Sequence, residues 1–136
     1  MSTTEKLNGY GPLAGVKVVE LCEWVAAPAC VRCLSEMGAT VIKVEPPYGD
    51  AQRTQGPGFG CEQTDMEDPT IDLNNTNKNF VSINLKNEEG MKFMKKLLAD
   101  ADIFVNNLRD KALNKMGLDY ETLHKEFPTL IWAQMR

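Results

Sequence analysis

The most distinctive polar run in this 136-residue chain is Asn74-Asn75-Thr76-Asn77-Lys78. Amide side chains both donate and accept hydrogen bonds, and a lysine ammonium is a compact positive charge that suits a phosphate. The run therefore fits a site for a phosphorylated ligand. It fits a polar turn that leads into a strand equally well, so both interpretations stay open here.

A second candidate site is the turn formed by residues 22–28 (CEWVAAP), which follows an apolar run. In an open parallel sheet, ligands bind at the carboxyl ends of the strands. The turn lacks the G-x-G-x-x-G pattern that lets a backbone approach a dinucleotide pyrophosphate, which argues against NAD binding. The small Ala26 and Ala27 either admit a ligand closely or pack a helix on the sheet, and composition alone favours packing.

Four further residues are interpreted as structural. Cys30 and Cys33 have the C-x-x-C spacing of redox and zinc sites, but they fall inside an expected helix, so they are read as small core residues. His124, the only histidine, has no serine or cysteine near it and is read as a surface residue. Glu45 ends an expected strand and is read as a solvated carboxylate. No metal site is expected.

Composition narrows the classes of function. The net charge of -4 and the pI near 5.0 argue against a general nucleic-acid-binding protein, which needs a surplus of cations. No apolar run is long enough to span a membrane, and the polar residues 1–10 do not resemble a secretory signal. A cytoplasmic location is expected, where the cysteines stay reduced.

Short apolar runs rich in β-branched residues are expected to form strands. They cover residues 16–21 (VKVVEL), 40–45 (TVIKVE), 80–85 (FVSINL), 103–106 (IFVN) and 130–134 (LIWAQ). The runs are nearly continuous in apolar residues, which is typical of strands buried on both faces of a parallel sheet.

Segments with helical spacing separate these runs. The expected helices cover residues 28–37, 88–100 and 112–116, and a further helix follows Asp119 and ends by Pro128. Asn87 is a suitable N-cap for the second helix, and Gly38 is suited to end the first. The alternation of strands and helices predicts an α/β fold in which helices cover a parallel sheet.

Residues 46–79 break this alternation. The segment holds four of the seven prolines and four of the ten glycines, and a structureless loop of this length is either functional or disordered. No internal repeat or linker marks a second domain, so one domain covering residues 1–136 is expected.

Several blocks of the sequence together resemble CoA-transferase family III. Residues 12–21 (PLAGVKVVEL), 38–45 (GATVIKVE), 75–78 (NTNK), 101–107 (ADIFVNN) and 112–117 (ALNKMG) are similar to motifs of that family. Each block is weak alone, but in order and at suitable spacing they are specific. The detail in residues 70–78 and 117–123 resembles members that act on 2-hydroxy acids such as phenyllactate or 2-hydroxyisocaproate.

The resemblance implies a homodimer of interlocked chains, with this chain as its Rossmann-like, CoA-binding amino-terminal segment and helices on both faces of the sheet. In this family an aspartate attacks the acyl-CoA thioester, and CoA then passes through an enzyme thioester to a second carboxylic acid. By motif, that aspartate lies beyond Arg136. No catalytic residue is therefore expected in this chain, which is expected to be truncated and inactive alone.

The resemblance also implies contacts with CoA or acyl-CoA by position. The expected contacts are Val25, Ala26, Leu73, Asn75, Lys78, Asn107, Leu108, Arg109, Lys115 and Arg136. The four cations among them suit the phosphates of CoA.

Two alternatives remain. An acyl-CoA racemase or epimerase belongs to the same family, and its acid–base pair would also lie beyond Arg136. A non-catalytic module that holds a nucleotide or a partner chain belongs to a different class. Saturable CoA binding that is lost in Lys78→Ala would support a preformed pocket, whereas no binding would leave a partner role open.

Overall fold

The computed structural model describes residues 10–62, 64 and 67–136. The expectation that residues 1–9 form a polar start without a signal lies outside the described residues. Within them, no helix is long and apolar enough to cross a membrane.

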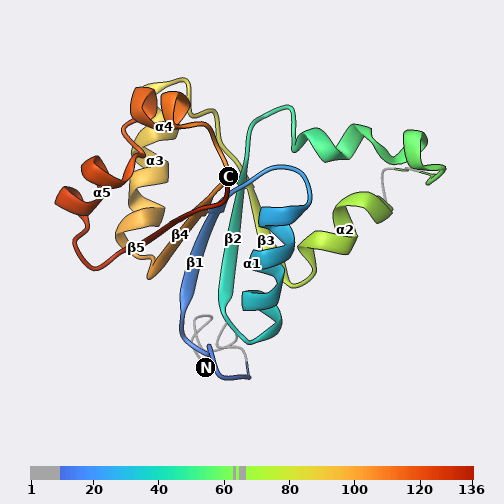
Figure 1. Ribbon diagram of the computed structural model, residues 1–136, viewed down its shortest axis with the longest axis horizontal. Coiled ribbons are helices and arrows are strands. Elements are labelled where there is room, and N and C mark those ends of the chain that lie inside the picture. Colours follow the sequence, from blue (N-terminus) through green and yellow to red (C-terminus); the bar gives the residue numbers. More distant parts are fainter. Residues whose placement is uncertain (1–9, 63, 65–66) are drawn as a thin grey trace.

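Five parallel strands form one sheet in the order β3-β2-β1-β4-β5 (Figure 1). The strands are β1 (Lys17–Leu21), β2 (Thr40–Glu45), β3 (Lys78–Ser82), β4 (Ile103–Asn106) and β5 (Ile131–Gln134). Each neighbouring pair is parallel, and Val19 of β1 lies opposite both Ile42 and Phe104. The predicted α/β fold with a parallel sheet is confirmed.

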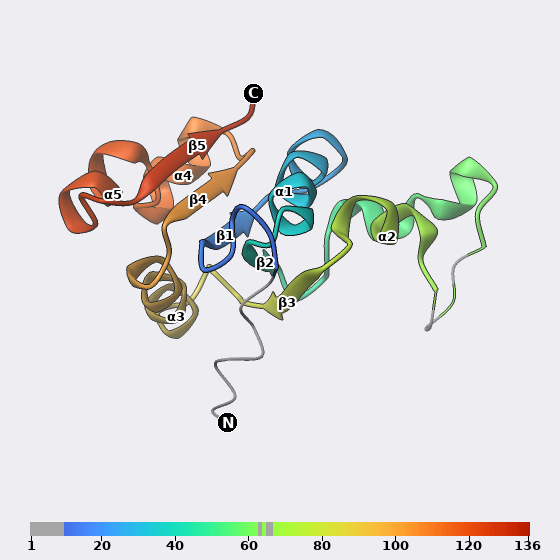
Figure 2. The same ribbon diagram turned by 90° about the horizontal axis from the view of Figure 1, so that it is seen from below.

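Helices cover both faces of the sheet (Figure 2). They are α1 (Ala26–Glu36), α2 (Pro69–Asn75), α3 (Glu88–Ala99), α4 (Asp110–Met116) and α5 (Tyr120–Glu126). Neighbouring residues of β1 point into two hydrophobic cores, one on each face of the sheet. Val19 packs with Met94 and Leu98 of α3, whereas Val18 packs with Val31 of α1. Both faces of the central strands β1, β2 and β4 are mostly buried, which explains why their sequences do not alternate regularly with polar residues.

The expected helix ends agree closely with the structure. Asn87 caps α3 by accepting a hydrogen bond from the Gly90 N–H at 2.7 Å. Gly38 follows α1 with a φ of 100°, a left-handed conformation that glycine adopts without steric cost. Gly90 is required for a different reason, because a Cβ there would lie 2.1 Å from the Asn84 carbonyl oxygen.

The segment 46–79 differs from the expected long loop. Its described part contains two short 3-10 helices, η2 (Ala51–Thr54) and η3 (Gly56–Phe59), followed by α2. Strand β3 also begins at Lys78, before the expected residue 80, because Lys78 pairs with Val41 of β2. The polar side chains at its start find partners inside the fold, so strand pairing prevails over the low apolar content of the sequence there.

Candidate functional site

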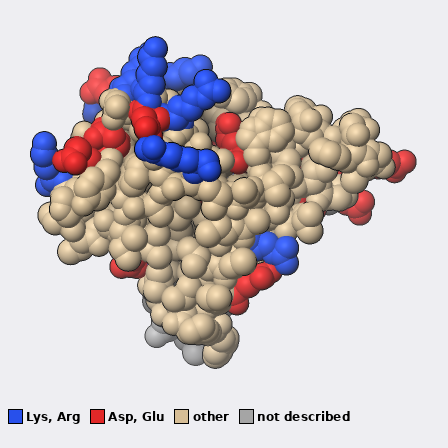
Figure 3. Space-filling view, viewed as in Figure 1, with Lys and Arg blue, Asp and Glu red and all other residues tan. Residues whose placement is uncertain are grey.

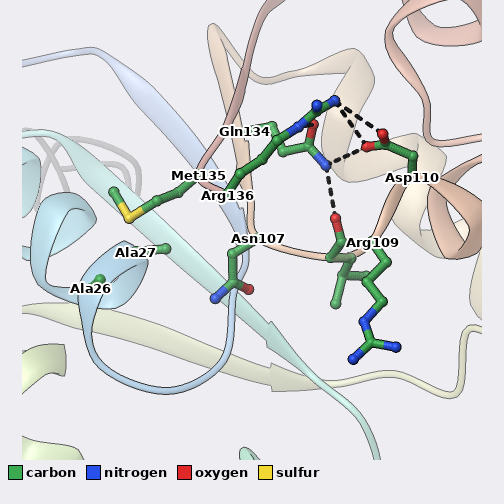
Figure 4. Close-up of a pocket in the computed structure, with 9 residues that line it drawn as sticks. Ala26, Ala27, Asn107, Arg109, Asp110, Gln134, Met135 and Arg136 are labelled. Carbon is green, nitrogen blue, oxygen red and sulfur yellow. Dashed lines mark hydrogen bonds and ion pairs between the residues drawn. The ribbon is translucent and has the colours of Figure 1, made fainter.

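An open pocket of about 460 Å³ lies at the carboxyl ends of β1, β4 and β5 (Figure 4). This place follows from the topology, because the loops after parallel strands all emerge at the same edge of the sheet. The pocket is lined by Ala26, Ala27, Asn107, Leu108, Arg109, Asp110, Gln134, Met135 and Arg136.

Asp110 organises the polar rim of this pocket. Its Oδ2 lies 3.0 Å from Nη2 of Arg136, and its Oδ1 accepts a hydrogen bond from Nε2 of Gln134 at 2.9 Å. The guanidinium of Arg109 points away from this cluster (Figure 4) and makes no ion pair within the described part of the chain. Lys and Arg side chains also gather over α4, with acidic side chains among them (Figure 3). The rim therefore offers cations to an anionic ligand.

The turn between β1 and α1 forms one wall of the pocket, and side chains from elsewhere hold its main chain. Asn107 accepts a hydrogen bond from the Glu23 N–H at 3.0 Å and donates one to the Glu23 carbonyl at 2.7 Å. The Trp24 N–H donates to Oδ1 of Asp50 at 3.1 Å, and Nζ of Lys43 donates to the Cys22 carbonyl at 2.8 Å.

A buried charge network stands behind this turn. Nζ of Lys43 lies 2.9 Å from Asp50 Oδ2 and 3.3 Å from Glu20 Oε1, and Nζ of Lys78 lies 2.8 Å from Glu20 Oε2. Burial raises the pKa of Glu20, against the pull of the two lysines. Burial lowers the pKa of Lys78, whereas the carboxylates of Glu20 and Asp50 outweigh burial at Lys43 and raise its pKa.

The structure brings half of the expected CoA contacts together. Ala26, Asn107, Leu108, Arg109 and Arg136 line the pocket, and the half-exposed Val25 precedes Ala26 at the start of α1. Leu73 is exposed on α2, and Lys115 is exposed on α4. Neither lines this pocket.

Lys78 and Asn75 are placed differently from the expectation of a phosphate site. Besides Glu20, Nζ of Lys78 donates to the Pro28 carbonyl at 2.8 Å and to Oδ1 of Asn75 at 2.9 Å. The amide nitrogen of Asn75 donates to the Ile71 carbonyl at 2.8 Å. Both side chains are buried and occupied with protein partners, so in this structure they join α1, α2 and β3 and do not face the pocket.

A second, apolar pocket of about 300 Å³ lies beside the first. Leu108 lines both pockets, so they meet at the loop after β4. The second pocket includes residues that sequence reasoning missed: Pro46, Pro47, Tyr48, Lys86 and Met116. Met116 lies in the block of residues 112–117 that resembles the family, but it was not expected to contact a ligand. The carboxyl ends of β2 and β3 were a signal that a ligand site extends in this direction.

Glu23 supplies an acid to the second pocket. Its pKa is raised because burial disfavours the carboxylate and the charge of Asp50 repels it.

Three structural interpretations change. Cys30 and Cys33 are exposed on α1 and are not core residues, whereas Cys22 is buried. The helix turns its cysteine positions to solvent because Ala27 and Val31 occupy its buried face. Glu45 is buried rather than solvated, and Arg53 contacts both of its oxygens at 2.8 and 2.9 Å.

Two other interpretations concern His124 and metal binding. His124 is exposed and stacks on Tyr120, with 5.2 Å between ring centres, as expected of a surface residue. Among the described residues, no group of three or more His, Cys, Asp or Glu side chains could hold a metal ion.

Comparison with known proteins identifies the family. The profile of CoA-transferase family III matches residues 13–136. The chain belongs to CoA-transferase family III. A Brucella suis protein of the CaiB/BaiF family, known from its crystal structure, superposes with a TM-score of 0.83 at 38% identity, covering 91% of this chain and 33% of that chain.

Two relatives of this family III chain have assigned reactions. The (R)-2-hydroxy-4-methylpentanoate CoA-transferase of Clostridioides difficile is 48% identical over 90% of this chain. The cinnamoyl-CoA:phenyllactate CoA-transferase of Clostridium sporogenes is 46% identical over 94% of it. The chain spans 31% of the length of each of these relatives.

Proposed function

We propose that this chain is the CoA-binding segment of a CoA-transferase that moves CoA between an acyl-CoA and a carboxylic acid. The observation that carries the proposal is the open, cation-rimmed pocket at the carboxyl ends of β1, β4 and β5 in a family III chain. The names of the two relatives support a 2-hydroxy acid as the acceptor class.

The two pockets fit the two chemical ends of CoA. The apolar pocket beside Leu108 and Met116 suits a planar adenine ring, and Lys86 at its edge suits a phosphate. The open pocket suits the polar pantetheine arm, with Arg109 and Arg136 near its phosphates. Because Leu108 lines both, one elongated ligand can cross the loop after β4.

The covalent chemistry belongs to the whole protein. In the proposed reaction, an aspartate carboxylate beyond Arg136 attacks the thioester carbonyl and expels the CoA thiolate. That thiolate then attacks the aspartyl carbonyl of the mixed anhydride, releases the first acid and leaves an aspartyl-CoA thioester. The second acid reverses these steps and departs as its CoA thioester. The proposed whole protein is a cytoplasmic, interlocked homodimer.

Titration of the chain with CoA in a calorimeter tests the binding site. We expect saturable binding that Arg109→Ala weakens about tenfold, since a charge-assisted contact to a phosphate contributes roughly 1.5–3 kcal/mol. Lys111→Ala is the matched control, because Lys111 is an exposed cation on α4 that lines neither pocket. Equal losses of CoA affinity in both variants would mean that Arg109 acts only through the overall charge and does not contact the ligand.

A second experiment tests the reaction. The full-length protein is incubated with an acyl-CoA and a labelled 2-hydroxy acid, and the transfer of CoA to the label is followed by mass spectrometry. Transfer supports the proposal. Inversion of the α-carbon of an acyl-CoA without transfer would support a racemase of the same family instead.

A further inference from the structure

Side chains bind the main chain of the pocket turn at three consecutive residues. Lys43 holds the Cys22 carbonyl, Asn107 holds both main-chain groups of Glu23, and Asp50 accepts the Trp24 N–H. The three side chains come from β2, from the loop after β4 and from the loop before η2. This short turn is therefore fixed from three separate parts of the fold.

Trp24 needs such support because its φ is 69°. In this left-handed region the Cβ of an ordinary residue lies too close to the backbone, and the conformation persists only where surrounding contacts enforce it. The side chain of Trp24 is about half exposed, at 48%, so packing alone does not enforce it. The contact that acts directly on its main chain is the hydrogen bond to Asp50.

Asp50 is suited to this task because its own position is fixed. It is 1% exposed, and its Oδ1 also accepts the Gln52 N–H at 2.9 Å. Its Oδ2 pairs with Lys43, whose side chain is fully buried. The ammonium of Lys43 thus binds both the Cys22 carbonyl and the Asp50 carboxylate that accepts the Trp24 N–H.

We propose that Asp50, supported by Lys43, is a positioning residue that holds the turn at Trp24 in its left-handed form and thereby shapes the CoA pocket. Helix α1 begins two residues later, and its first residues, Ala26 and Ala27, line the pocket. The N-cap residue Val25 makes no side-chain cap. The turn therefore helps to place the start of α1, together with the hydrogen bond from Lys78 to the Pro28 carbonyl. This inference rests on the proposed CoA-binding function.

The test compares Asp50→Ala with the unaltered chain in two measurements. Hydrogen exchange followed by NMR reports the Trp24 N–H, with the Val19 N–H in the core of β1 as the internal reference. Calorimetry reports CoA affinity. We expect the Trp24 N–H to exchange faster than the lower global stability reported by Val19 accounts for, because Asp50→Ala also leaves Lys43 buried without this partner. We also expect roughly tenfold weaker binding, the order of effect of releasing one strained backbone conformation.

Asp119→Ala is the matched control. Asp119 caps α5 through the Thr122 N–H at 3.0 Å, so the variant also loses a capping aspartate but leaves the turn intact. We expect CoA affinity within about twofold of the unaltered chain, a change below roughly 0.5 kcal/mol. A loss equal to that of Asp50→Ala would mean that lower stability, and not the turn, weakens binding, and the proposal would fail.

A second pair of variants acts at Trp24 and leaves Asp50 in place. Glycine adopts a φ near 69° without steric cost, whereas the branched Cβ of valine opposes it. We expect Trp24→Val to bind CoA more weakly than Trp24→Gly. We also expect Asp50→Ala to lower CoA affinity less than threefold when Trp24→Gly is present. A glycine at this position is not strained, so the hydrogen bond to Asp50 is then no longer needed to enforce the left-handed conformation. Equal affinities of the two Trp24 variants would overturn the role of the left-handed turn.

The outcomes separate this inference from the function on which it rests. If the unaltered chain binds no CoA, the proposed binding function fails, and the positioning role fails with it. If the chain binds CoA and Asp50→Ala frees the Trp24 N–H without weakening binding, the proposed function stands and the positioning inference is wrong.

Discussion

Asn107 grips the main chain of Glu23 with both atoms of its amide, accepting from the N–H at 3.0 Å and donating to the carbonyl at 2.7 Å. Asn107 lies in the loop after β4, and Glu23 lies in the loop after the neighbouring strand β1. An asparagine expected to contact CoA therefore also joins the two loops that form the pocket. An amide fits this role because it presents one acceptor and one donor side by side.

Replacing Asn107 tests this pairing. We expect Asn107→Ala to lower the free energy of unfolding by about 2 kcal/mol, because two hydrogen bonds are lost and partly buried main-chain groups stay unpaired. Asn107→Asp should retain the acceptor but place a carboxylate against the Glu23 carbonyl, and so should not restore stability at pH 7. Urea unfolding followed by circular dichroism measures both effects. Asn114→Ala on the exposed face of α4 is the control, and a loss as large there would contradict the specific role of Asn107.

Lys78 is expected to contribute to the free energy of unfolding more than to CoA affinity. Its ammonium pairs with Glu20 inside the fold, and removal of one member of a buried pair costs about 3 kcal/mol. We expect Lys78→Met to lower the midpoint of urea unfolding strongly. Without urea, at a temperature where the variant stays folded, its CoA affinity should remain within about threefold of that of the unaltered chain, since the lost charge faces Glu20. A stable variant with abolished CoA binding would show instead that Lys78 reaches the ligand.

Glu23 is predicted to oppose both stability and ligand binding at neutral pH. Burial raises its pKa in the folded chain, so its contribution to stability is fully present below the unfolded pKa, about 4.5, and is lost as the pH rises through the folded pKa. We therefore expect Glu23→Gln to match the unaltered chain near pH 4 and to become the more stable protein toward pH 7. The variant should also bind the polyanionic CoA more tightly at pH 7, because a negative charge leaves the pocket.

Parallel urea titrations and calorimetry at several pH values check this pair of effects. A stability difference that shrinks as the pH rises would contradict the raised pKa of Glu23.

Three of the four cysteines should divide by reactivity. The thiol of Cys22 is buried and donates to the Val105 carbonyl, and burial followed by the charge of Glu20 raises its pKa. We expect iodoacetamide to modify Cys30 and Cys33 in the folded chain and Cys22 only after unfolding. Peptide mapping by mass spectrometry measures each site. Rapid modification of Cys22 in the folded chain would mean that the turn after β1 opens readily.

The sheet was predictable because its signal is local. Each strand run carries apolar residues for both faces, and the caps at Asn87 and Gly38 act within a few residues of their helices. The start of β3 was less predictable, since Lys78 enters the sheet with its charge matched by Glu20, 58 positions earlier in the chain. The local sequence around Lys78 does not indicate a charge partner that lies so far away along the chain.

The sequence by itself determined the order of the strands and of the helices outside residues 46–79, the parallel class of the sheet and the edge at which ligand residues gather, because these follow from apolar periodicity and chain direction. Only the tertiary structure decided how individual polar side chains are used. Lys78 and Asn75 turn inward, and Asp50 and Lys43 support Trp24, a role that no motif indicated. The physical reason is that a hydrogen-bonding side chain takes its role from the partner it meets, and folding chooses that partner from distant parts of the chain.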